Sequence, residues 1–249
     1  MELFNPYSLS GKTILVTGSS SGIGRGIAIT CAQLGATVIC QGRNKKKLED
    51  TIEQMPNGTH KLIVGDLTKL EEIFQLVSSL PPLDGIVHCA GVGQRKLCKQ
   101  LEEADINTVM DINFKAPVML QAEILKQKKI KKQASIIFIT SIASESPSIG
   151  NAIYSASKGA LKAYSKCLAL ELAPRQIRVN CVSPAMVWTD LIINDVIIKE
   201  DLLEDEKRYP LKRYGKPEDI AYLVGYLLSD ASVWMTNSNL NITGGVDQL

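Results

Sequence analysis

The stretch Thr17-Gly-Ser-Ser-Ser-Gly-Ile-Gly24 stands between an apolar run, Lys12–Thr17, and a helical pattern that begins at Gly22. Gly18 permits a tight turn, and Gly22 and Gly24 allow the start of a helix to pack close to a strand. The free N–H groups of the first helical turn favour an anion such as a pyrophosphate. Glycines in this pattern are weak evidence alone, but a strand before them and a helix after them predict a dinucleotide-binding βαβ unit.

Outward from this turn, strand-like runs alternate with helical patterns along the whole chain. The predicted strands are Lys12–Thr17, Thr37–Gln41, His60–Val64, Gly85–Cys89, Ser135–Thr140, Arg178–Val182 and Ser238–Ile242. The predicted helices are Gly22–Leu34, Lys45–Met55, Lys69–Leu80, Asn113–Lys129, Ala152–Leu172 and Pro217–Ser229. Runs such as Ile136-Ile-Phe-Ile139 are apolar at successive positions, as in strands covered on both faces. The pattern predicts an α/β fold: a single Rossmann-type doubly wound domain over residues 1–249, with a seven-stranded, mostly parallel sheet and helices on both faces.

One segment, residues 186–212, interrupts the alternation of strands and helices. It mixes isoleucine-rich and acidic patches between a predicted strand and a predicted helix. An insertion of this length at the carboxyl edge of a sheet is typical of a lid. Its apolar groups, Leu191–Ile193 and Val196–Ile198, either cover an apolar substrate or form an amphipathic helix that closes the core.

The end of the second predicted strand bears on the choice of nicotinamide cofactor. An acidic residue at this position would bind the ribose 2′-hydroxyl of NAD(H). This chain has Gln41-Gly42-Arg43 instead, followed by Lys45, Lys46 and Lys47. Arginine suits a 2′-phosphate, so NADP(H) is favoured over NAD(H), although Arg43 could also be an ordinary surface charge.

The stretch Tyr154-Ser-Ala-Ser-Lys158 places a phenol and an ammonium four residues apart. On a helix these two positions share a face. An ammonium beside a phenol is expected to lower the tyrosine pKa from its usual value of about 10, which suits acid–base chemistry. The spacing alone more often marks an ordinary half-exposed helix, so the remaining motifs must decide.

Composition and charge exclude several classes of protein. Apolar residues make up 45% and charged residues 22% of the chain, the balance of a soluble globular protein. The net charge of +2 favours neither nucleic acid nor a membrane surface as a partner. Six scattered cysteines and two histidines predict no disulfide framework and no metal site. No signal-like or membrane-spanning segment is evident, so a cytoplasmic protein is expected.

Taken in order, these motifs resemble the short-chain dehydrogenase/reductase family, in its branch of about 250 residues, over essentially the whole chain. The matching segments are Thr17–Gly24, Asp66-Leu67, His88-Cys-Ala-Gly91, Asn113, Ser141, the Tyr154/Lys158 pair and Ser183-Pro184. The branch that reduces 3-oxoacyl thioesters on acyl carrier protein is the nearest in overall pattern.

The resemblance implies a role for each matching residue. Tyr154 would be the general acid in carbonyl reduction, Lys158 would lower the Tyr154 pKa and bind the nicotinamide ribose, and Ser141 would polarise the carbonyl. Asn113 would position a water that feeds protons through Lys158. Asp66 would accept from the adenine amino group, and Val187 and Thr189 would hold the carboxamide. With the glycine turn and Arg43, the predicted cofactor-binding residues are Gly18, Ser20, Ser21, Gly22, Ile23, Gly24, Arg43, Asp66, Leu67, Ala90, Gly91, Asn113, Tyr154, Lys158, Pro184, Val187 and Thr189.

Some positions depart from the family pattern. His88 and Cys89 replace paired asparagines, and Ala185 stands where glycine is usual. Ala90 and Gly91 are kept, so cofactor binding is expected to survive, and His88 is expected to be a hydrogen-bonding core residue. No catalytic group is lost.

The sequence leaves two hypotheses of different classes. One is an NADP(H)-dependent enzyme that interconverts a carbonyl and a secondary alcohol, with 3-oxoacyl thioesters, sugars and steroids as open substrate classes and NAD(H) as a second possibility for the cofactor. The other is a cofactor-binding sensor or regulatory protein that has kept the fold. Arg175, Lys131 and Lys132 could meet an acidic acyl carrier protein or could be solvated surface. The family implies a homotetramer, with a dimer as the next expectation.

Overall fold

In the part of the chain that the structure describes, seven strands form one sheet in which all neighbouring strands run parallel. The structure is a computed structural model and describes residues 5–193 and 199–246. The order across the sheet is β3-β2-β1-β4-β5-β6-β7. The strands are β1 (Thr13–Thr17), β2 (Thr37–Gly42), β3 (Lys61–Val64), β4 (Leu83–His88), β5 (Ile130–Ile139), β6 (Arg178–Pro184) and β7 (Asn239–Ile242). The predicted doubly wound α/β sheet is confirmed.

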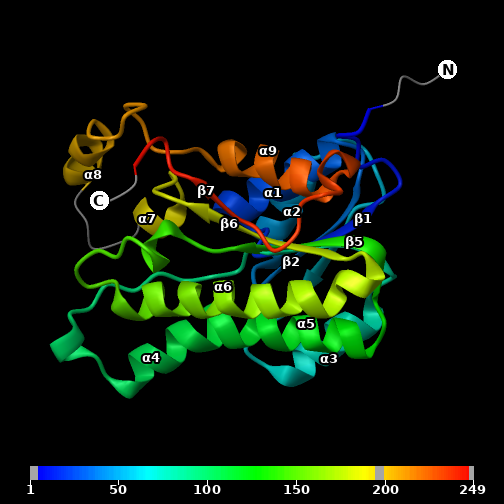
Figure 1. Cartoon of the computed structure of the whole chain (residues 1–249), viewed down its shortest axis with the longest axis horizontal. Helices are drawn as coiled ribbons and strands as arrows, with labels where there is room; N and C mark the ends of the chain where they lie inside the picture. Colours follow the sequence, from blue (N-terminus) through cyan, green and yellow to red (C-terminus); the bar gives the residue numbers. More distant parts are fainter. Residues whose placement is uncertain (1–4, 194–198, 247–249) are drawn as a thin grey trace.

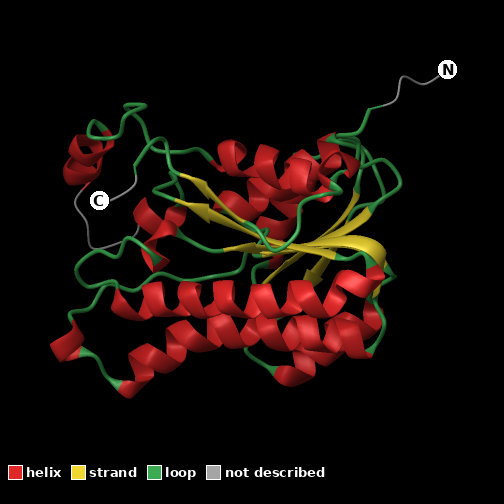
Figure 2. Ribbon diagram, viewed as in Figure 1, coloured by secondary structure: helices red, strands yellow, loops and turns green. Residues whose placement is uncertain are grey.

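Helices cover both faces of this sheet (Figures 1 and 2). The helices are α1 (Gly22–Gln33), α2 (Lys45–Glu53), α3 (Leu70–Ser79), α4 (Glu103–Met110), α5 (Ala116–Lys126), α6 (Ala152–Leu172), α7 (Asp190–Ile193), α8 (Lys199–Glu206) and α9 (Pro217–Leu228). Helices α1, α2 and α9 lie on one face, and α3, α4, α5 and α6 on the other. None of the helices that the structure describes is long and apolar enough to cross a membrane.

The packing of β1 explains why polar and apolar residues do not alternate along this strand. Ile14 and Val16 pack into the core beneath α1 and α9, whereas Leu15 packs into the core beneath α3, α5 and α6. All three side chains are fully buried. Successive side chains of a strand point to opposite faces, so a strand covered on both faces must be apolar at every position.

The chain reverses its direction across the sheet between β1 and β4, which lie side by side. The turn after β1 and the loop after β4 therefore meet at the carboxyl edge of the sheet. They meet closely, since a Cβ added at Gly18 would lie 2.8 Å from the Cα of Ala90. Open α/β sheets bind their ligands at such a reversal point.

The predicted helix Asn113–Lys129 is wrong at both ends. Helical structure begins at Glu103, passes through a π-helical turn at Asp111–Lys115 and ends at Lys126. A π-helical turn shifts the hydrogen-bonding register by one residue and is often found at functional sites. Asn113 lies in the middle of this turn.

Strand β5 begins five residues earlier than predicted, at Ile130. The pairing of β4 with β5 jumps from Leu83–Ile130 to Gly85–Ser135, so extra residues of β5 bulge out of the ladder. Gln133, within the bulge, has a positive φ of 61°. Lys131 and Lys132 thus lie on a strand.

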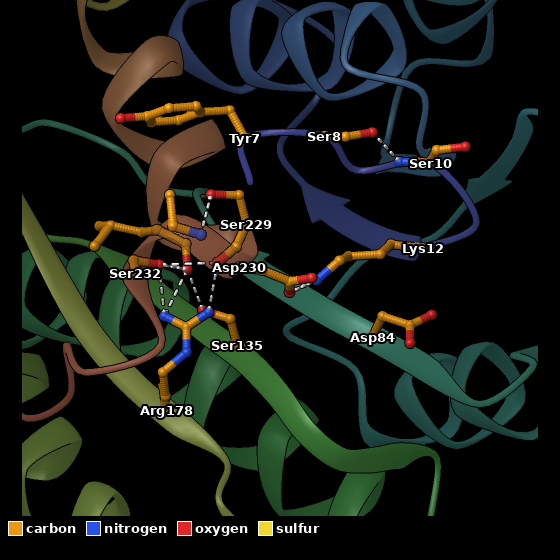
Figure 3. Close-up of polar contacts among 12 residues, drawn as sticks. Tyr7, Ser8, Ser10, Lys12, Asp84, Ser135, Arg178, Ser229, Asp230 and Ser232 are labelled. Atoms are coloured by element: carbon orange, nitrogen blue, oxygen red, sulfur yellow. Dashed lines mark hydrogen bonds and ion pairs between the residues drawn. The ribbon is translucent and has the colours of Figure 1, made fainter. Parts of the chain in front are cut away.

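At the opposite edge of the sheet, a buried arginine binds the end of α9 (Figure 3). Nη1 of Arg178 donates to the Leu227 carbonyl at 2.8 Å and to the Ser232 hydroxyl at 2.9 Å, while Nη2 donates to the Ser229 carbonyl at 3.3 Å. Ser135 also donates to the Leu227 carbonyl. A guanidinium here both satisfies the last carbonyls of the helix and complements its dipole.

The segment 186–212 contains the short helices α7 and α8, and we call it the lid. Two of its apolar side chains, Leu202 and Tyr209, form a small core with Tyr214 and Val246 from beyond the lid. Polar contacts tie α8 down: Tyr214 donates to Asp205 at 2.8 Å, and Trp188 donates to Glu206 at 2.9 Å. Ile192 packs against this core, whereas Val196–Ile198 lies outside the described residues.

Candidate active site

A cleft of about 1080 Å³ opens at the carboxyl edge of the sheet, where the chain reverses direction. Its size is slightly above the range of roughly 300–1,000 Å³ that is usual for ligand pockets. Of the residues predicted to be catalytic or cofactor-binding, all except Asn113 line this cleft. They are Gly18, Ser20, Ser21, Gly22, Ile23, Gly24, Arg43, Asp66, Leu67, Ala90, Gly91, Ser141, Tyr154, Lys158, Pro184, Val187 and Thr189.

The glycine turn forms one end of the cleft because side chains would not fit there. A Cβ at Gly24 would lie 2.2 Å from the Gly18 carbonyl oxygen, so only glycine lets α1 start this close to the turn. Gly22 has a φ of +51°, and a Cβ there would lie 3.1 Å from the side chain of Thr189 on the opposite wall. The start of α1 thus faces open space with its first N–H groups free, as the phosphates of a dinucleotide require. The turn fits a nicotinamide dinucleotide.

Two charged residues follow β2 and β3 at the same edge. Arg43 is exposed and lines the cleft, together with Lys47 from α2. The Asp66 carboxylate accepts from the backbone N–H and the hydroxyl of Thr68, at 3.0 and 2.8 Å. The hydrogen bond from the Thr68 backbone is the main reason that the pKa of Asp66 is lowered, and Arg43 adds to the effect. Asp66 is thus held ionised beside the positive charge of Arg43.

Tyr154 and Lys158 lie one turn apart on α6. The Lys158 ammonium is buried, donates to the Ile139 carbonyl at 2.9 Å and lies 5.7 Å from the centre of the Tyr154 ring. Burial lowers the pKa of Lys158 to about 8. The two side chains share one face of α6, as the spacing predicted.

The pKa of Tyr154 contradicts the sequence-based prediction. Burial raises it above the ordinary value, and a hydrogen bond with Ser141 lowers it by less. Loss of water around the phenol therefore outweighs the hydrogen bond from Ser141, and Cys89 raises the pKa further. Tyr154 in this structure is a phenol that keeps its proton at neutral pH.

Ser141 is placed by the end of β5. Its backbone is still extended, with a φ of −165°, and its Oγ accepts from the backbone N–H of Ala143 at 3.1 Å. This contact fixes the oxygen and leaves the hydroxyl proton to be donated elsewhere. Ser141 and Tyr154 thus bring two hydroxyl donors to one wall of the cleft.

Asn113 does not line the cleft, and its side chain is occupied by the protein. Its Oδ1 accepts from the backbone N–H of Val92 at 2.8 Å. Its Nδ2 donates to the Val92 carbonyl at 2.9 Å and to the Ser157 hydroxyl at 3.1 Å. The side chain therefore joins the loop after β4 to α6. It does border the site, because a Cβ at Gly91 would lie 3.2 Å from Asn113 Oδ1 and 3.5 Å from Lys158 Nζ.

The two positions that depart from the family pattern at the end of β4 are accommodated in different ways. His88 is buried, its Nε2 lies 3.0 Å from Gln121 Oε1, and its ring stacks on Phe138 with centroids 4.6 Å apart. Cys89 lines the cleft, and its backbone N–H donates to Thr17 Oγ1 at 3.0 Å. Thr17 also accepts from the N–H of Ala90 at 3.2 Å, so it holds the loop beside the glycine turn.

Several residues that line the rest of the cleft were not predicted from the sequence. Those from the loops are Gln94, Arg95, Ser146, Ser148 and Asn151, and those from the lid and just beyond it are Asp201, Leu202, Glu204, Asp205, Arg208 and Tyr214. Their segments carry no motif, and only the fold brings them to Tyr154. Ile192, one of the lid residues expected to cover a substrate or close the core, lines the cleft and also packs against the small core of the lid. Nowhere in the described ranges do three or more His, Cys, Asp or Glu side chains converge as possible metal ligands.

Known proteins with similar sequences match nearly the whole chain. Residues 18–247 match the sequence family described as enoyl-(acyl carrier protein) reductase. A 3-oxoacyl-[acyl-carrier-protein] reductase of Rickettsia bellii is 37% identical over 238 residues, which cover 96% of this chain and 98% of that protein. An L-xylulose reductase of Caenorhabditis elegans is 33% identical over 246 residues, which cover 96% and 97%.

Solved structures show the same architecture. A dehydrogenase/reductase from Sinorhizobium meliloti superposes with a TM-score of 0.88 at 33% identity, covering 96% of both chains. An enzyme from Beutenbergia cavernae, provisionally named an NAD(P)-dependent gluconate 5-dehydrogenase, superposes with a TM-score of 0.87 at 29% identity, covering 97% of this chain and 98% of that one. That structure holds NADP at low occupancy.

Proposed function

The chain belongs to the short-chain dehydrogenase/reductase family of NAD(P)-dependent oxidoreductases, and we propose that it uses NADP(H) to interconvert a carbonyl group and a secondary alcohol. One observation carries this proposal: Ser141, Tyr154 and Lys158 line the same cleft as the glycine turn at Gly18–Gly24. A dinucleotide bound at that turn and a substrate at Tyr154 would share one continuous space.

The residues of the cleft fit carbonyl reduction in particular. A bound reduced nicotinamide would supply the hydride. Ser141 donates a hydrogen bond to the carbonyl oxygen, where negative charge develops. Tyr154 then transfers its hydroxyl proton to that oxygen, and its raised pKa keeps this proton available at neutral pH. The Lys158 ammonium stabilises the phenolate that remains until a proton returns from solvent.

Arg43 supports NADP(H) over NAD(H). It follows β2, where an acidic residue would favour the 2′-hydroxyl of NAD(H). Lys47 lines the same cleft as Arg43 and pairs with Asp190 at 3.7 Å. The dianionic 2′-phosphate of NADP(H) complements the Arg43 guanidinium.

Two substrate classes follow from the relatives, namely 3-oxoacyl groups on acyl carrier protein and ketoses such as xylulose. The residues that could contact an acidic acyl carrier protein lie far from the cleft of their own chain. Lys131 is at the start of β5 and pairs with Asp84 at 2.8 Å, and Arg175 precedes β6 and donates to the Ile130 carbonyl at 2.7 Å. Both are at the opposite edge of the sheet from Tyr154. An acyl carrier protein bound there could deliver its acyl group only to the cleft of another subunit.

We also propose a cytoplasmic homotetramer, with a dimer as the alternative. Large apolar side chains on α6 and near β7 support assembly, since Leu170 is 69% and Trp234 97% exposed. Light scattering coupled to size-exclusion chromatography measures the subunit number directly.

The test of the proposed function follows NADPH absorbance while a panel of diketones, 3-oxoacyl esters and keto-sugars is added. We expect oxidation of NADPH with at least one carbonyl class. Tight binding of NADPH without turnover on the whole panel would instead support the alternative, a cofactor-binding sensor that has kept the fold.

A further inference from the structure

The cleft continues beyond Tyr154 into a region that the dinucleotide does not need. Its walls are the loop before α6, the loop after β4 and the lid helix α8. Helices α7 and α8 lie at the end of the molecule toward which β6 and β7 point (Figure 1). We call this region the substrate pocket, and its lining indicates what kind of carbonyl compound enters it.

The wall next to Tyr154 is polar and its polar groups are free. Ser146, Ser148 and Asn151 line the cleft, and their side chains form no hydrogen bond with any residue in the described ranges. Asn151 precedes α6 without capping it. Across the pocket, Nε2 of Gln94 donates to Asp105, and its Oε1 has no partner among the described residues. Hydroxyl and amide groups left without partners beside a reacting centre can bind the hydroxyl groups of a substrate.

The lid adds charged groups of both signs. Asp201, Glu204, Asp205 and Arg208 line the cleft, and Arg95 from the loop after β4 lines it too. Glu204 pairs with Lys207, and Asp205 pairs with Arg208 at 3.8 Å, whereas Asp201 has no cationic partner in the chain as described. The Asp201 carboxylate repels anionic substrates such as keto acids within a Debye length of about 8–10 Å. It can also accept hydrogen bonds from neutral hydroxyl groups.

Among the described residues, the apolar side chains of the lid and of Tyr214 beyond it pack mostly on one another. Leu202, Tyr209 and Tyr214 are almost completely buried in the core that they form with Val246, and Met186 and Ile192 pack against it. Leu202 and Tyr214 border the cleft, but only 3% and 1% of these residues are exposed. A long acyl chain needs exposed apolar surface, and these two buried side chains provide little of it.

From these observations we propose that the substrate is a neutral, polyhydroxylated carbonyl compound of the ketose type, bound through Ser146, Ser148 and Asn151. This inference rests on the proposed function and specifies its substrate class. The carbonyl carbon gains a hydride from the reduced nicotinamide, which is oxidised, and the carbonyl oxygen gains the Tyr154 proton, so a ketone becomes a secondary alcohol. The hydroxyl groups on neighbouring carbons bind the polar wall and orient the carbonyl toward Ser141 and Tyr154.

The test uses four carbonyl compounds built on the same four-carbon chain, each reduced with NADPH. They are erythrulose, 1-hydroxy-2-butanone, the acetoacetyl thioester of N-acetylcysteamine and 2-oxobutanoate. The first two share the C1 hydroxyl and differ only in the hydroxyl groups on C3 and C4, of which the C3 group is also next to the carbonyl; the variants below therefore separate recognition from activation of the carbonyl. We expect kcat/KM for erythrulose to exceed that for each of the other three by at least tenfold.

Variants of the polar wall then test which residues bind the hydroxyl groups of the substrate. In the double variant Ser146→Ala/Ser148→Ala, and separately in Asn151→Ala, the ratio of kcat/KM between erythrulose and 1-hydroxy-2-butanone should fall about tenfold, mainly through KM for erythrulose. Ser155→Ala is the matched control, because its hydroxyl is buried without a partner in the described chain but does not line the cleft. That variant should keep the wild-type ratio.

The outcomes separate this inference from the proposed function. Reduction of the thioester, the keto acid or 1-hydroxy-2-butanone as efficiently as erythrulose would overturn the substrate class and leave the oxidoreductase in place. An unchanged ratio in both variants would overturn the role of the polar wall. If NADPH binds and none of the four compounds is reduced, the proposed function itself fails, and the substrate class fails with it.

Discussion

At Tyr154, burial raises the pKa of the phenol and a hydrogen bond with Ser141 lowers it by less. The four-residue spacing from Lys158 predicted a lowered pKa, yet burial raises it. The sequence shows which groups lie on one face of a helix, but not how much water surrounds them. A protonated phenol suits reduction, because the proton must leave Tyr154 as the alcohol forms. Oxidation of an alcohol would need the phenolate and should be favoured at higher pH.

Arg43 carries the prediction of cofactor choice. Arg43→Ala should weaken NADPH binding about 10- to 100-fold, since a charged contact with a phosphate contributes roughly 1.5–3 kcal/mol. NADH binding should change less than about threefold, because NADH lacks the 2′-phosphate. Isothermal titration calorimetry measures both dissociation constants.

Lys46→Ala is the control for Arg43→Ala. Lys46 lies three residues away, pairs with Asp50 at 3.0 Å and does not line the cleft. It should leave both affinities near the wild-type values. Equal losses for NADPH and NADH in Arg43→Ala would refute a contact with the 2′-phosphate.

His88 makes the folded protein sensitive to acid. Burial lowers its pKa from 6.5 to about 4. Between these two values the unfolded chain binds a proton at His88 that the folded chain does not, so stability falls as the pH falls from 6.5 toward 4. At pH 5 this linkage amounts to about 2 kcal/mol lost relative to pH 8.

The variant His88→Asn removes this linkage. Urea unfolding at pH 8 and pH 5 should show a decrease in the free energy of unfolding that is about 2 kcal/mol smaller in the variant than in the wild type. His60→Gln, which removes the other histidine, controls for the loss of a histidine as such. The same decrease in wild type and His88→Asn would show that His88 is not held neutral in the folded protein.

At the scale of elements, the sequence correctly predicted most of the segments that form helices and strands. It did not predict the irregularities within them. The helix Ala152–Leu172 was predicted to the residue. The π-helical turn at Asp111–Lys115 and the bulge before Ser135 were missed. Both depend on tertiary contacts, since Asn113 in the turn is bound to Val92 and Ser157 from other elements.

The end of α9 depends on one buried side chain. Arg178→Met should lower the free energy of unfolding by about 3 kcal/mol, because the Leu227 and Ser229 carbonyls and the Ser232 hydroxyl lose their donor inside the protein. Chemical denaturation measures the loss. The cleft lies at the other edge of the sheet, so the dissociation constant for NADPH should not change.

A nearby ion pair provides the control for Arg178→Met. Lys12 pairs with Asp230, just beyond α9, and the Asp230 side chain is 67% exposed. Lys12→Met should therefore cost less than about 1 kcal/mol. If the two variants cost the same, burial of the Arg178 contacts contributes nothing to the stability of the fold.

At the scale of the whole molecule, strand order is what assembles the site. Residues from after β1, β2, β3, β4, β5 and β6 meet in one cleft because parallel strands end at the same edge of the sheet. Motifs at strand ends were therefore predictable, and all the predicted site residues except Asn113 line the cleft. Ser146, Ser148, Asn151 and the lid carboxylates were not predictable, because their positions depend on loop paths that no local pattern specifies.

The central claim is that Tyr154 transfers a proton in the cleft that holds the nicotinamide, and Tyr154→Phe tests it most directly. The variant removes one hydroxyl and keeps the ring under Lys158. The measurement pairs the dissociation constant for NADPH with the single-turnover rate of NADPH oxidation by a carbonyl compound that the wild type reduces. The account predicts NADPH binding within about threefold of the wild type and a turnover rate at least 1,000-fold lower, the size of a strong general-acid contribution. Turnover near the wild-type rate with normal NADPH binding would contradict it.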